Sequence, residues 1–341
     1  MLPMSGWVYP LLRCPTCQQR LVYRPGQDAD SGSLEHEANG CGRRYPVTGG
    51  IARLLVDDGR ENAVVIAFDD EWRRFSDVGT KDHTDLYTRY FDVLSMEDLR
   101  DDQIVLDAGC GAGRWAFEVS LRGPRVVAVD LGRSVEIARA NTDAERVACV
   151  QADVSALPLE HESVDWAYSL GVLHHLEDPA SALRNIVRTV KPGGRVLLYL
   201  YYALSDRGLA FRAVFRAVDL ARRIISRQPR PIVVMLATVI AACIYWPLAR
   251  TAAALEHMSA QELAAKLPLN FYRDLSFATM RNDSVDRFGT RLERRYSQAE
   301  MVELMHGAGL VDVRISDSPP FWHGIGRKPV VVRQAHESRC D

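Results

Sequence analysis

The chain has 341 residues, of which 47% are hydrophobic and 25% are charged, so its length and composition suit a soluble protein of one large or two modest domains. The formal net charge of −2 removes any global electrostatic reason to expect nucleic-acid binding. Seven unevenly scattered cysteines argue against a disulfide framework and favour a cytoplasmic protein.

Two short cysteine motifs mark the beginning of the chain. The segment "RCPTCQQRL" places Cys14 and Cys17 in a CxxC turn, and "GCGRRYPVTGGIARLL" adds Cys41 before a strand-like end. This arrangement resembles small zinc ribbons, whose second half usually carries another CxxC pair before a similar "GRxYP" run. Ala38 stands where the first cysteine of that pair is expected, so the resemblance implies His36 as the fourth ligand of a structural zinc ion. The alternative is a ribbon without metal, held by packing, whose three cysteines are buried thiols.

Alternating helices and strands are predicted in the middle of the chain. Two helices are predicted around "DDEWRRF" and "LYTRYFDVLSMEDL". Five apolar segments then predict strands: "QIVLDAG", "RVVAVDL", "ACVQADV", "VDWAYSL" and "GRVLLYLYY". Between the last two, Leu183, Ile186, Val187 and Val190 recur at i, i+3, i+4 and i+7, which predicts a helix with one apolar face. This alternation is typical of a parallel sheet with crossover helices.

An insertion without predicted strands follows. No charged residue occurs from Pro231 to Ala249, which is long enough for a membrane-spanning helix. A single crossing would separate strands that must pair in one sheet. The segment is therefore predicted to be a buried lid helix, a dimer contact or a helix in a membrane interface. The arginines upstream of it suit a membrane surface or an anionic substrate, or else form a solvated basic face: Arg207, Arg212, Arg216, Arg222, Arg223, Arg227 and Arg230.

Helix and strand patterns return near the end of the chain. Ser297 and Glu300 have capping-box spacing at the start of a helix, and "LVDVRIS" and "FWHGIGRK" predict a sixth and a seventh strand. The fold class is therefore α/β, with an open sheet that binds its ligand at the carboxyl ends of the strands. The predicted domains are a ribbon-like unit (1–56), the core (57–202), a helical and apolar insertion (203–296), the return of the core (297–330) and a tail (331–341).

The segment "VLDAGCGAGRW" gives the most specific ligand prediction. Gly109, Gly111 and Gly113 leave the backbone free to adopt positive φ and to lie against a ligand, in a GxGxG spacing that differs from the dinucleotide GxGxxG. Asp107 stands just before this loop, where a carboxylate repels a pyrophosphate and attracts an ammonium group. Asp130 ends the second strand, where it can accept from both hydroxyls of a ribose. A cationic, ribose-bearing ligand without phosphates fits these features, and S-adenosylmethionine is such a ligand.

These motifs resemble the class I S-adenosylmethionine-dependent methyltransferases over roughly residues 60–328. The segment "LHHLEDP" followed by "VKPGGRVLL" is similar to the ubiquinone-methyltransferase-like group, and small zinc ribbons are fused to, or partner, methyltransferases. The resemblance implies a Rossmann-like sheet of seven strands, the last antiparallel, with a helical insertion before the sixth. The implied cofactor contacts are Asp107, Gly109, Cys110, Gly111 and Gly113 for the methionine end, Asp130 for the ribose, Leu131, Asp153 and Val154 for the adenine, and Ser169 and Leu170 for the sulfonium. The alternative is a Rossmann-type core that binds another nucleotide or none.

Candidates for chemistry with the methyl acceptor follow the fourth and fifth strands. Methyl transfer is an in-line displacement, so alignment in a dry site supplies most of the acceleration, and a base is needed only if the acceptor must lose a proton. His174 and His175 are the predicted bases; the alternative is that they pack into a helix start and bond a backbone carbonyl. Tyr201, Tyr202 and Arg281 are predicted substrate contacts.

The predicted function is methyl transfer to a small-molecule or lipid-linked acceptor. The protein is expected in the cytoplasm, with a peripheral contact to the inner face of the membrane and a homodimer as further expectations. The alternative is an RNA base methyltransferase, because ribosomal guanine methyltransferases also carry an N-terminal zinc ribbon. The near-neutral charge and the apolar insertion count against nucleic acid. A non-enzymatic subunit is disfavoured by the intact glycine loop and its carboxylates.

Overall fold

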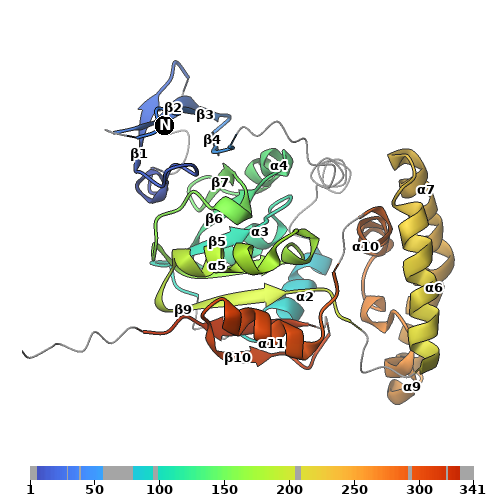
Figure 1. The fold of residues 1–341 in the computed structure, drawn as a ribbon. Coiled ribbons are helices and arrows are strands. Elements are labelled where there is room, and N and C mark those ends of the chain that lie inside the picture. The colour runs from blue at the N-terminus through green and yellow to red at the C-terminus, as the bar shows by residue number, and fades with distance from the viewer. Residues whose placement is uncertain are drawn as a thin grey trace, which may run out of the picture.

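The computed structural model describes residues 6–28, 30–37, 40–56, 80–94, 99–203, 209–290, 294–319 and 322–330. Their strands form one eleven-stranded sheet in the order β1-β2-β3-β4-β7-β6-β5-β8-β9-β11-β10 (Figure 1). The helix predicted at "DDEWRRF" and the tail predicted at 331–341 lie outside the described residues.

Seven of these strands form the predicted core. They are β5 (Ile104–Ala108), β6 (Arg125–Asp130), β7 (Val147–Gln151), β8 (Val164–Leu170), β9 (Val190–Tyr199), β10 (Val311–Ile315) and β11 (His323–Arg327). All run parallel except β11, which pairs antiparallel with both β9 and β10. The predicted seven-stranded sheet with an antiparallel last strand is therefore confirmed. The strand order reverses beside β5, so the ligand-binding edge is expected at the carboxyl end of β5.

Helices cover both faces of the core sheet. The helices α2 (Lys81–Tyr90), α3 (Arg114–Ser120) and α4 (Ser134–Asn141) pack on one face, and α5 (Pro179–Thr189) and α11 (Gln298–Gly307) pack on the other. Successive residues of β5 alternate between the two cores, with Val105 on the α3 side and Leu106 on the α5 side. The predicted capping box of Ser297 and Glu300 is present at the start of α11.

Two predicted helix boundaries differ from the structure. The helix predicted around "LYTRYFDVLSMEDL" begins earlier, at Lys81, and ends at Tyr90, because Phe91 leaves the helical conformation. Val190 was predicted on the apolar face of a helix, but α5 ends at Thr189. Val190 is the first residue of β9, because its extended backbone pairs with Val164 of β8.

The N-terminal strands extend the core sheet beyond β7 (Figure 1). A short 3-10 helix (Tyr9–Leu11) is followed by β1 (Leu21–Pro25), β2 (Ser31–His36), β3 (Tyr45–Thr48) and β4 (Ile51–Arg53). Each of these strands pairs antiparallel with the next one along the chain. The strand β4 then pairs parallel with β7. Arg53 strengthens this junction, because its guanidinium donates to Gln151 at 2.7 Å and pairs with Glu136 at 3.1 Å.

The insertion forms a helical layer outside the core. It contains α6 (Leu209–Ile225), α7 (Arg230–Ile240), α8 (Trp246–His257), α9 (Gln261–Lys266) and α10 (Phe277–Gly289), and a π-helical turn (Ala241–Tyr245) joins α7 to α8. In Figure 1, α6 and α7 form the outermost layer, and α10 lies between them and the core. The Ser284 hydroxyl of α10 donates to the Ala237 carbonyl of α7 at 2.8 Å, and Phe288 packs on the same residue.

One continuous helix of the insertion is apolar enough to cross a membrane. By length and composition Arg230–His257 is the single candidate span among the described residues, and 28% of its most apolar window is buried. The strands β10 and β11 come later in the chain and join the sheet that begins before this helix. Both ends of the helix therefore connect to the same folded core.

Candidate functional site

The glycine loop leaves β5 in a conformation that suits glycine. Gly109, Gly111 and Gly113 have φ angles of 89°, 52° and 82°. A Cβ atom at Gly109 would lie 2.3 Å from the Val172 side chain. The Gly109 N–H donates to the Val129 carbonyl at 2.8 Å, which fixes the loop between β5 and β6. The loop thus holds three glycines, whose backbone no side chain covers, at the carboxyl end of β5.

Two carboxylates lie at the carboxyl ends of β6 and β7, the next two strands of the sheet on one side of β5. Asp130 ends β6, and its oxygens accept from the N–H groups of Gly111 at 2.9 Å and Gly132 at 3.0 Å. These bonds orient the carboxylate against the glycine loop. Asp153 follows β7 and accepts from the Ser155 N–H at 2.7 Å, which caps a short 3-10 helix (Val154–Ala156). Both carboxylates, with Leu131 next to the first, lie at the same edge of the sheet as the loop.

Asp107 is a buried carboxyl group at the end of β5. Its side chain is 1% exposed, and among the described residues neither carboxylate oxygen has a donor at normal hydrogen-bond geometry. Burial, with a contribution from nearby Asp130, raises the pKa of Asp107 to about 8. Because an unpaired buried charge is unfavourable, this site favours a cation that supplies both charge and hydrogen-bond donors.

Two further polar groups near the loop were not among the predicted site residues, although Arg114 belongs to the segment "VLDAGCGAGRW". Arg114 begins α3 directly after the loop, and its charge acts on both Asp107 and His83 of α2. Burial and this arginine lower the pKa of His83 to about 4. Among the described residues, the buried Arg114 Nε and His83 Nδ1 atoms have no hydrogen-bond partner. The loop is therefore flanked by a neutral imidazole and a guanidinium as well as by carboxylates.

Three predicted cofactor contacts have side chains that serve packing. The Ser169 hydroxyl is fully buried and donates to the Ala108 carbonyl at 2.8 Å, which ties β8 to β5. Cys110 is buried in the loop, and this burial raises the pKa of its thiol. Leu170 ends β8 and is also buried. For Ser169 and Cys110 the backbone is the part that remains for a ligand.

The two predicted catalytic histidines lie in a 3-10 helix (Leu173–His175) after β8. The His174 ring stacks on Tyr201 with 3.9 Å between ring centroids, and the centroids of the His174 and His175 rings are 4.0 Å apart. His174 is fully buried, and among the described residues neither of its ring nitrogens has a hydrogen-bond partner. Burial and His175 lower the pKa of His174 well below its usual range. The imidazole is therefore neutral, and its lowered pKa makes it a weak base.

Tyr201, one of the three predicted substrate residues, is held in place from the insertion. The Tyr201 hydroxyl donates to Asp286 of α10, and the Arg295 guanidinium lies 5.6 Å from the Tyr201 ring. The Tyr202 ring packs edge-on against Trp322 with 5.1 Å between centroids. Arg281 lies half-buried on α10.

Four tyrosines surround Asp283, and we call them the tyrosine cluster. Their proximity was not predicted from the sequence. Its rings are Tyr90 and Tyr199, 4.9 Å apart, and Tyr245 and Tyr272, 5.5 Å apart. The Tyr272 hydroxyl bonds to Asp283 of α10, and burial raises the pKa of Asp283 to about 6. These residues come from α2, β9, the π-helical turn, a 3-10 helix (Asn270–Tyr272) and α10. No spacing in the sequence indicates that five separate segments meet here.

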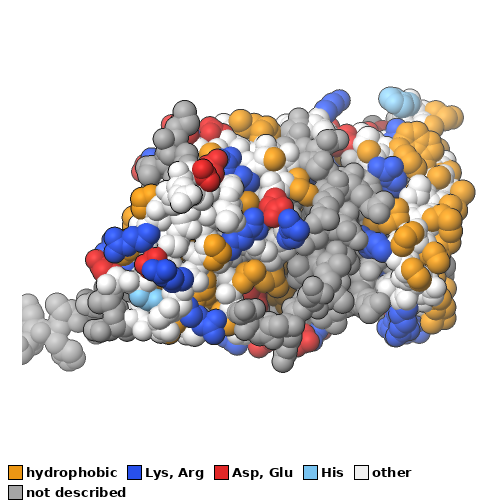
Figure 2. Space-filling model, turned by 90° about the horizontal axis from the view of Figure 1, so that it is seen from above, with side chains coloured by type: hydrophobic (Ala, Val, Ile, Leu, Met, Phe, Trp, Pro, Cys, Tyr) orange, Lys and Arg blue, Asp and Glu red, His pale blue; other side chains and the backbone are white. Residues whose placement is uncertain are grey.

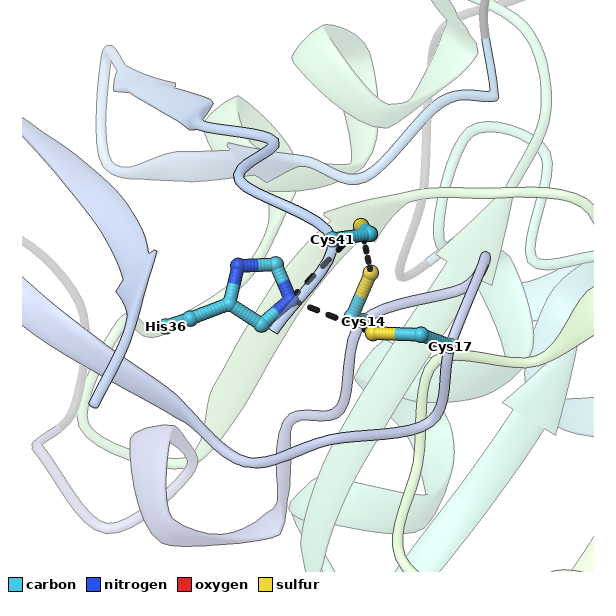
Figure 3. Close-up of side chains that lie close together, drawn as sticks. All are labelled: Cys14, Cys17, His36 and Cys41. Atoms are coloured by element: carbon cyan, nitrogen blue, oxygen red, sulfur yellow. Dashed lines mark hydrogen bonds between the residues drawn. The ribbon is translucent and has the colours of Figure 1, made fainter. Parts of the chain in front are cut away.

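Four side chains of the N-terminal unit point toward one another (Figure 3). The ligand atoms of Cys14, Cys17, His36 and Cys41 all lie within 4.8 Å of one another. The distance from Cys14 Sγ to Cys41 Sγ is 3.7 Å, and His36 Nε2 lies 3.3 Å from Cys17 Sγ and 3.8 Å from Cys41 Sγ. A tetrahedral zinc ion requires about 3.8 Å between two thiolates and about 3.6 Å between a thiolate and an imidazole nitrogen. The four donors therefore fit one zinc ion.

Local chemistry also suits a metal at this cluster. Backbone N–H groups of Gln19 and Cys41 lower the pKa of the Cys17 thiol to about 6, which favours the thiolate that binds metal. Gly40 leaves room for the imidazole, because a Cβ atom there would lie 1.9 Å from the His36 ring.

Comparisons with known proteins find a methyltransferase domain in the core. Residues 106–198 match the family model described as a methyltransferase domain. This segment contains the glycine loop, Asp130, Asp153 and both histidines. Over this segment the chain is similar to the class I S-adenosylmethionine-dependent methyltransferases. The family model therefore covers the edge of the sheet that carries the glycine loop and the two carboxylates.

The similarity to individual proteins is partial. An uncharacterized methyltransferase of Mycobacterium tuberculosis is 34% identical over 125 residues, which are 36% of this chain and 63% of that protein. The ubiquinone biosynthesis O-methyltransferase of Pseudomonas paraeruginosa is 36% identical over 98 residues, covering 28% of this chain and 42% of that protein. The solved magnesium protoporphyrin IX methyltransferase of Synechocystis is 14% identical, with a TM-score of 0.44 over 77% of this chain and 96% of that chain. The matched segments span 32% to 63% of the length of the curated relatives.

Proposed function

We propose that this methyltransferase acts in the cytoplasm and transfers a methyl group to a small-molecule or lipid-linked acceptor. The observation that carries the cofactor assignment is Asp107, a buried carboxyl group next to the glycine loop, whose oxygens accept no bond of normal hydrogen-bond geometry among the described residues and whose pKa is raised by burial. An ammonium group satisfies such a carboxylate, whereas a phosphate is repelled by it. Carboxylates at Asp107, Asp130 and Asp153 thus suit S-adenosylmethionine better than a dinucleotide.

The proposed binding roles follow from the donors and acceptors at this edge. Asp107 and the backbone of the glycine loop hold the methionine ammonium, and Arg114 with His83 suits the methionine carboxylate. Asp130 accepts from the ribose hydroxyls beside Leu131, and Asp153 accepts from the adenine amino group beside Val154. The buried Arg114 Nε and His83 Nδ1 atoms, which lack partners among the described residues, support a ligand that carries both charges of an amino acid.

In the proposed mechanism the chain positions the acceptor and excludes water. When bound, S-adenosylmethionine supplies a methyl group already activated on a sulfonium, so alignment provides most of the acceleration. His174 and His175 are the proposed bases for an acceptor that must lose a proton. Tyr201 orients the His174 ring by stacking and is itself fixed by Asp286.

The acceptor class is supported by the tyrosine cluster. Its four rings provide apolar faces, and Asp283 provides one polar group among them. This combination suits a ring-bearing or chain-bearing molecule with a hydroxyl or amino group. The similarity to a ubiquinone biosynthesis O-methyltransferase over residues of the core points to the same class.

The ribose assignment is tested with Asp130→Ala and Asp130→Asn in calorimetric titrations with S-adenosylmethionine. Because two charge-assisted hydrogen bonds are lost, we expect the alanine variant to bind about 100-fold more weakly or not at all. Asp143→Asn is the matched control, since Asp143 is an exposed carboxylate on the loop before β7. Undiminished binding by Asp130→Ala, in a protein with unchanged circular dichroism, overturns the assignment.

We also propose a structural zinc ion bound by Cys14, Cys17, His36 and Cys41. Four protein ligands leave no open position on zinc, so the ion serves the fold and not the reaction. The geometry of the donor set supports this proposal. Elemental analysis of the purified chain is expected to give one zinc ion per molecule, and a stoichiometry near zero after purification with zinc present contradicts it.

A further inference from the structure

The outer side of the insertion carries a set of apolar side chains that the described part of the chain leaves at least one third exposed. We call this set the outer apolar face. Its members are between 37% and 61% exposed: Leu220, Ile224, Ile232, Met235, Val239, Ile244 and Trp246. Figure 2 shows hydrophobic side chains gathered along the right-hand end of the molecule, where Figure 1 places α6 and α7.

The helix formed by α7, the π-helical turn and α8 buries mainly small side chains and exposes several large apolar ones. Its buried side consists mainly of small residues, Ala237, Ala241, Ala249 and Ala252, which allow close approach to the core. Larger apolar residues such as Met235 and Ile244 face outward. A helix that only covers a soluble core keeps its large apolar residues inside. The exposed set therefore indicates that a second apolar environment contacts this side.

Positive charge accompanies the outer apolar face. Residues 209–250 contain seven arginines and a single acidic residue, Asp219. Exposed Arg216 and Arg223 share one side of α6 with Leu220 and Ile224, because spacings of three, four and seven residues keep them on one stripe, and exposed Arg227 follows the end of the helix. The Arg250 guanidinium lies over the Trp246 ring, with its Cζ atom 4.5 Å from the ring centroid. Arginines and a tryptophan beside an apolar stripe are typical of helices at a membrane interface.

We propose that the outer apolar face binds the surface of a membrane that contains anionic lipids, with α6, α7 and α8 lying along the surface. The helices lie on the membrane and do not cross it, because the strands that follow return to the sheet. A second copy of the chain is less suitable as the occupant, since a symmetric dimer through this face would bring the two arginine sets together. An anionic surface complements both the apolar and the charged part.

This inference goes beyond the proposed function and does not depend on it. The same continuous helix presents Tyr245 to the tyrosine cluster from its buried side. Membrane docking would thus place the candidate acceptor site within one helix diameter of the lipid surface, where a lipid-linked acceptor is available.

The test is cosedimentation of the full chain with vesicles of phosphatidylcholine alone or with roughly one third phosphatidylglycerol. We expect binding to the anionic vesicles, weakened by high salt. The variant Arg216→Gln/Arg227→Gln is expected to bind more weakly by about fivefold per removed charge. The variant Ile224→Asn/Met235→Asn/Val239→Asn is expected to lose binding by about tenfold or more.

Two control variants change exposed residues of the same kinds elsewhere. Leu121→Asn replaces a leucine that is 67% exposed beside α3, and Arg24→Gln replaces an exposed arginine of β1. Both are expected to bind vesicles like the unmodified chain. The proposal is overturned if the unmodified chain stays in the supernatant with anionic vesicles, or if the triple variant binds as well as the unmodified chain. It is also overturned if light scattering shows a dimer that the triple variant abolishes while vesicles are not bound, because the face is then a subunit interface.

Discussion

The glycine loop and the helical insertion place their functional groups in different ways. Around Asp107 and Gly109 the positions are set within a few residues, by positive φ angles and by bonds from backbone N–H groups. The tyrosine cluster draws Tyr90, Tyr199 and Asp283 from segments that meet only through packing. The geometry of the cofactor end is therefore set by the local backbone. The geometry of the acceptor end is set by packing between distant segments.

The largest effect is expected from Gly109→Ala. The added Cβ atom must adopt a φ of 89° and would lie 2.3 Å from Val172. Left-handed strain and overlap together should lower the free energy of unfolding by about 2–4 kcal/mol and displace the loop, with cofactor binding lost. Urea unfolding and calorimetry with S-adenosylhomocysteine measure both effects.

Gly307→Ala is the matched control for this substitution. Gly307 ends α11, and a Cβ atom there would meet no atom within 4 Å. Its binding should be unchanged and its stability equal or higher by about 0.5–1 kcal/mol. Normal cofactor affinity of Gly109→Ala would show that the loop does not approach the ligand.

A comparable loss of stability, without direct loss of cofactor contacts, is expected at the cysteine cluster. Cys17→Ser should remove the zinc ion and lower the free energy of unfolding by at least about 3 kcal/mol, because metal binding contributes to folding. Gly40→Ala should act in the same direction, since its Cβ atom would displace the His36 ring. Cys243→Ser, at an exposed cysteine of the insertion, is the control. Equal zinc content in Cys17→Ser and the unmodified chain contradicts the assignment.

An effect that depends on pH is expected from Asp107. Its pKa is about 8 in the folded chain and 3.8 when unperturbed, so the folded state holds a proton that the unfolded state has released between these values. The free energy of unfolding should therefore fall as pH rises from about 4 to about 8. Asp107→Asn should flatten this dependence, as measured by urea unfolding across the range. An equally steep dependence in Asp107→Asn would assign the titration to another group.

The smallest effect is expected from Ser169→Ala. Its hydroxyl bonds to the Ala108 carbonyl and faces the interior, so stability should fall by about 1 kcal/mol. Cofactor affinity should stay within about twofold, because the backbone is the proposed contact. A loss of affinity greater than the loss of stability would move the Ser169 side chain into the binding site.

The sequence predicted those features that depend on neighbouring residues. The seven-stranded sheet follows from five apolar segments with helices between them and from two later strands. Asp107 and Asp130 were recognisable because each stands at a fixed place relative to a strand end. The resemblance to zinc ribbons led to His36, and the structure brings its Nε2 atom within 3.3 Å of Cys17 Sγ.

Features that depend on packing between distant segments could not be predicted. Nothing near Asp283 or Tyr90 in the sequence indicates that they share one cluster. The uncharged stretch from Pro231 to Ala249 left a lid, a dimer contact and a membrane helix open, because composition does not tell which side faces the core. The structure shows that Ala237 and Ala241 face inward and Met235 and Val239 face outward, an arrangement opposite to that expected from side-chain size.

The central claim is that the carboxylates at the glycine loop select a cationic adenosyl ligand. Calorimetry of the full chain with S-adenosylmethionine, NAD and ATP at about pH 7, in two buffers of different ionisation enthalpy, tests it most directly. We expect binding of S-adenosylmethionine alone, with proton release that disappears in Asp107→Asn. Tight binding of NAD or ATP without binding of S-adenosylmethionine would contradict the account.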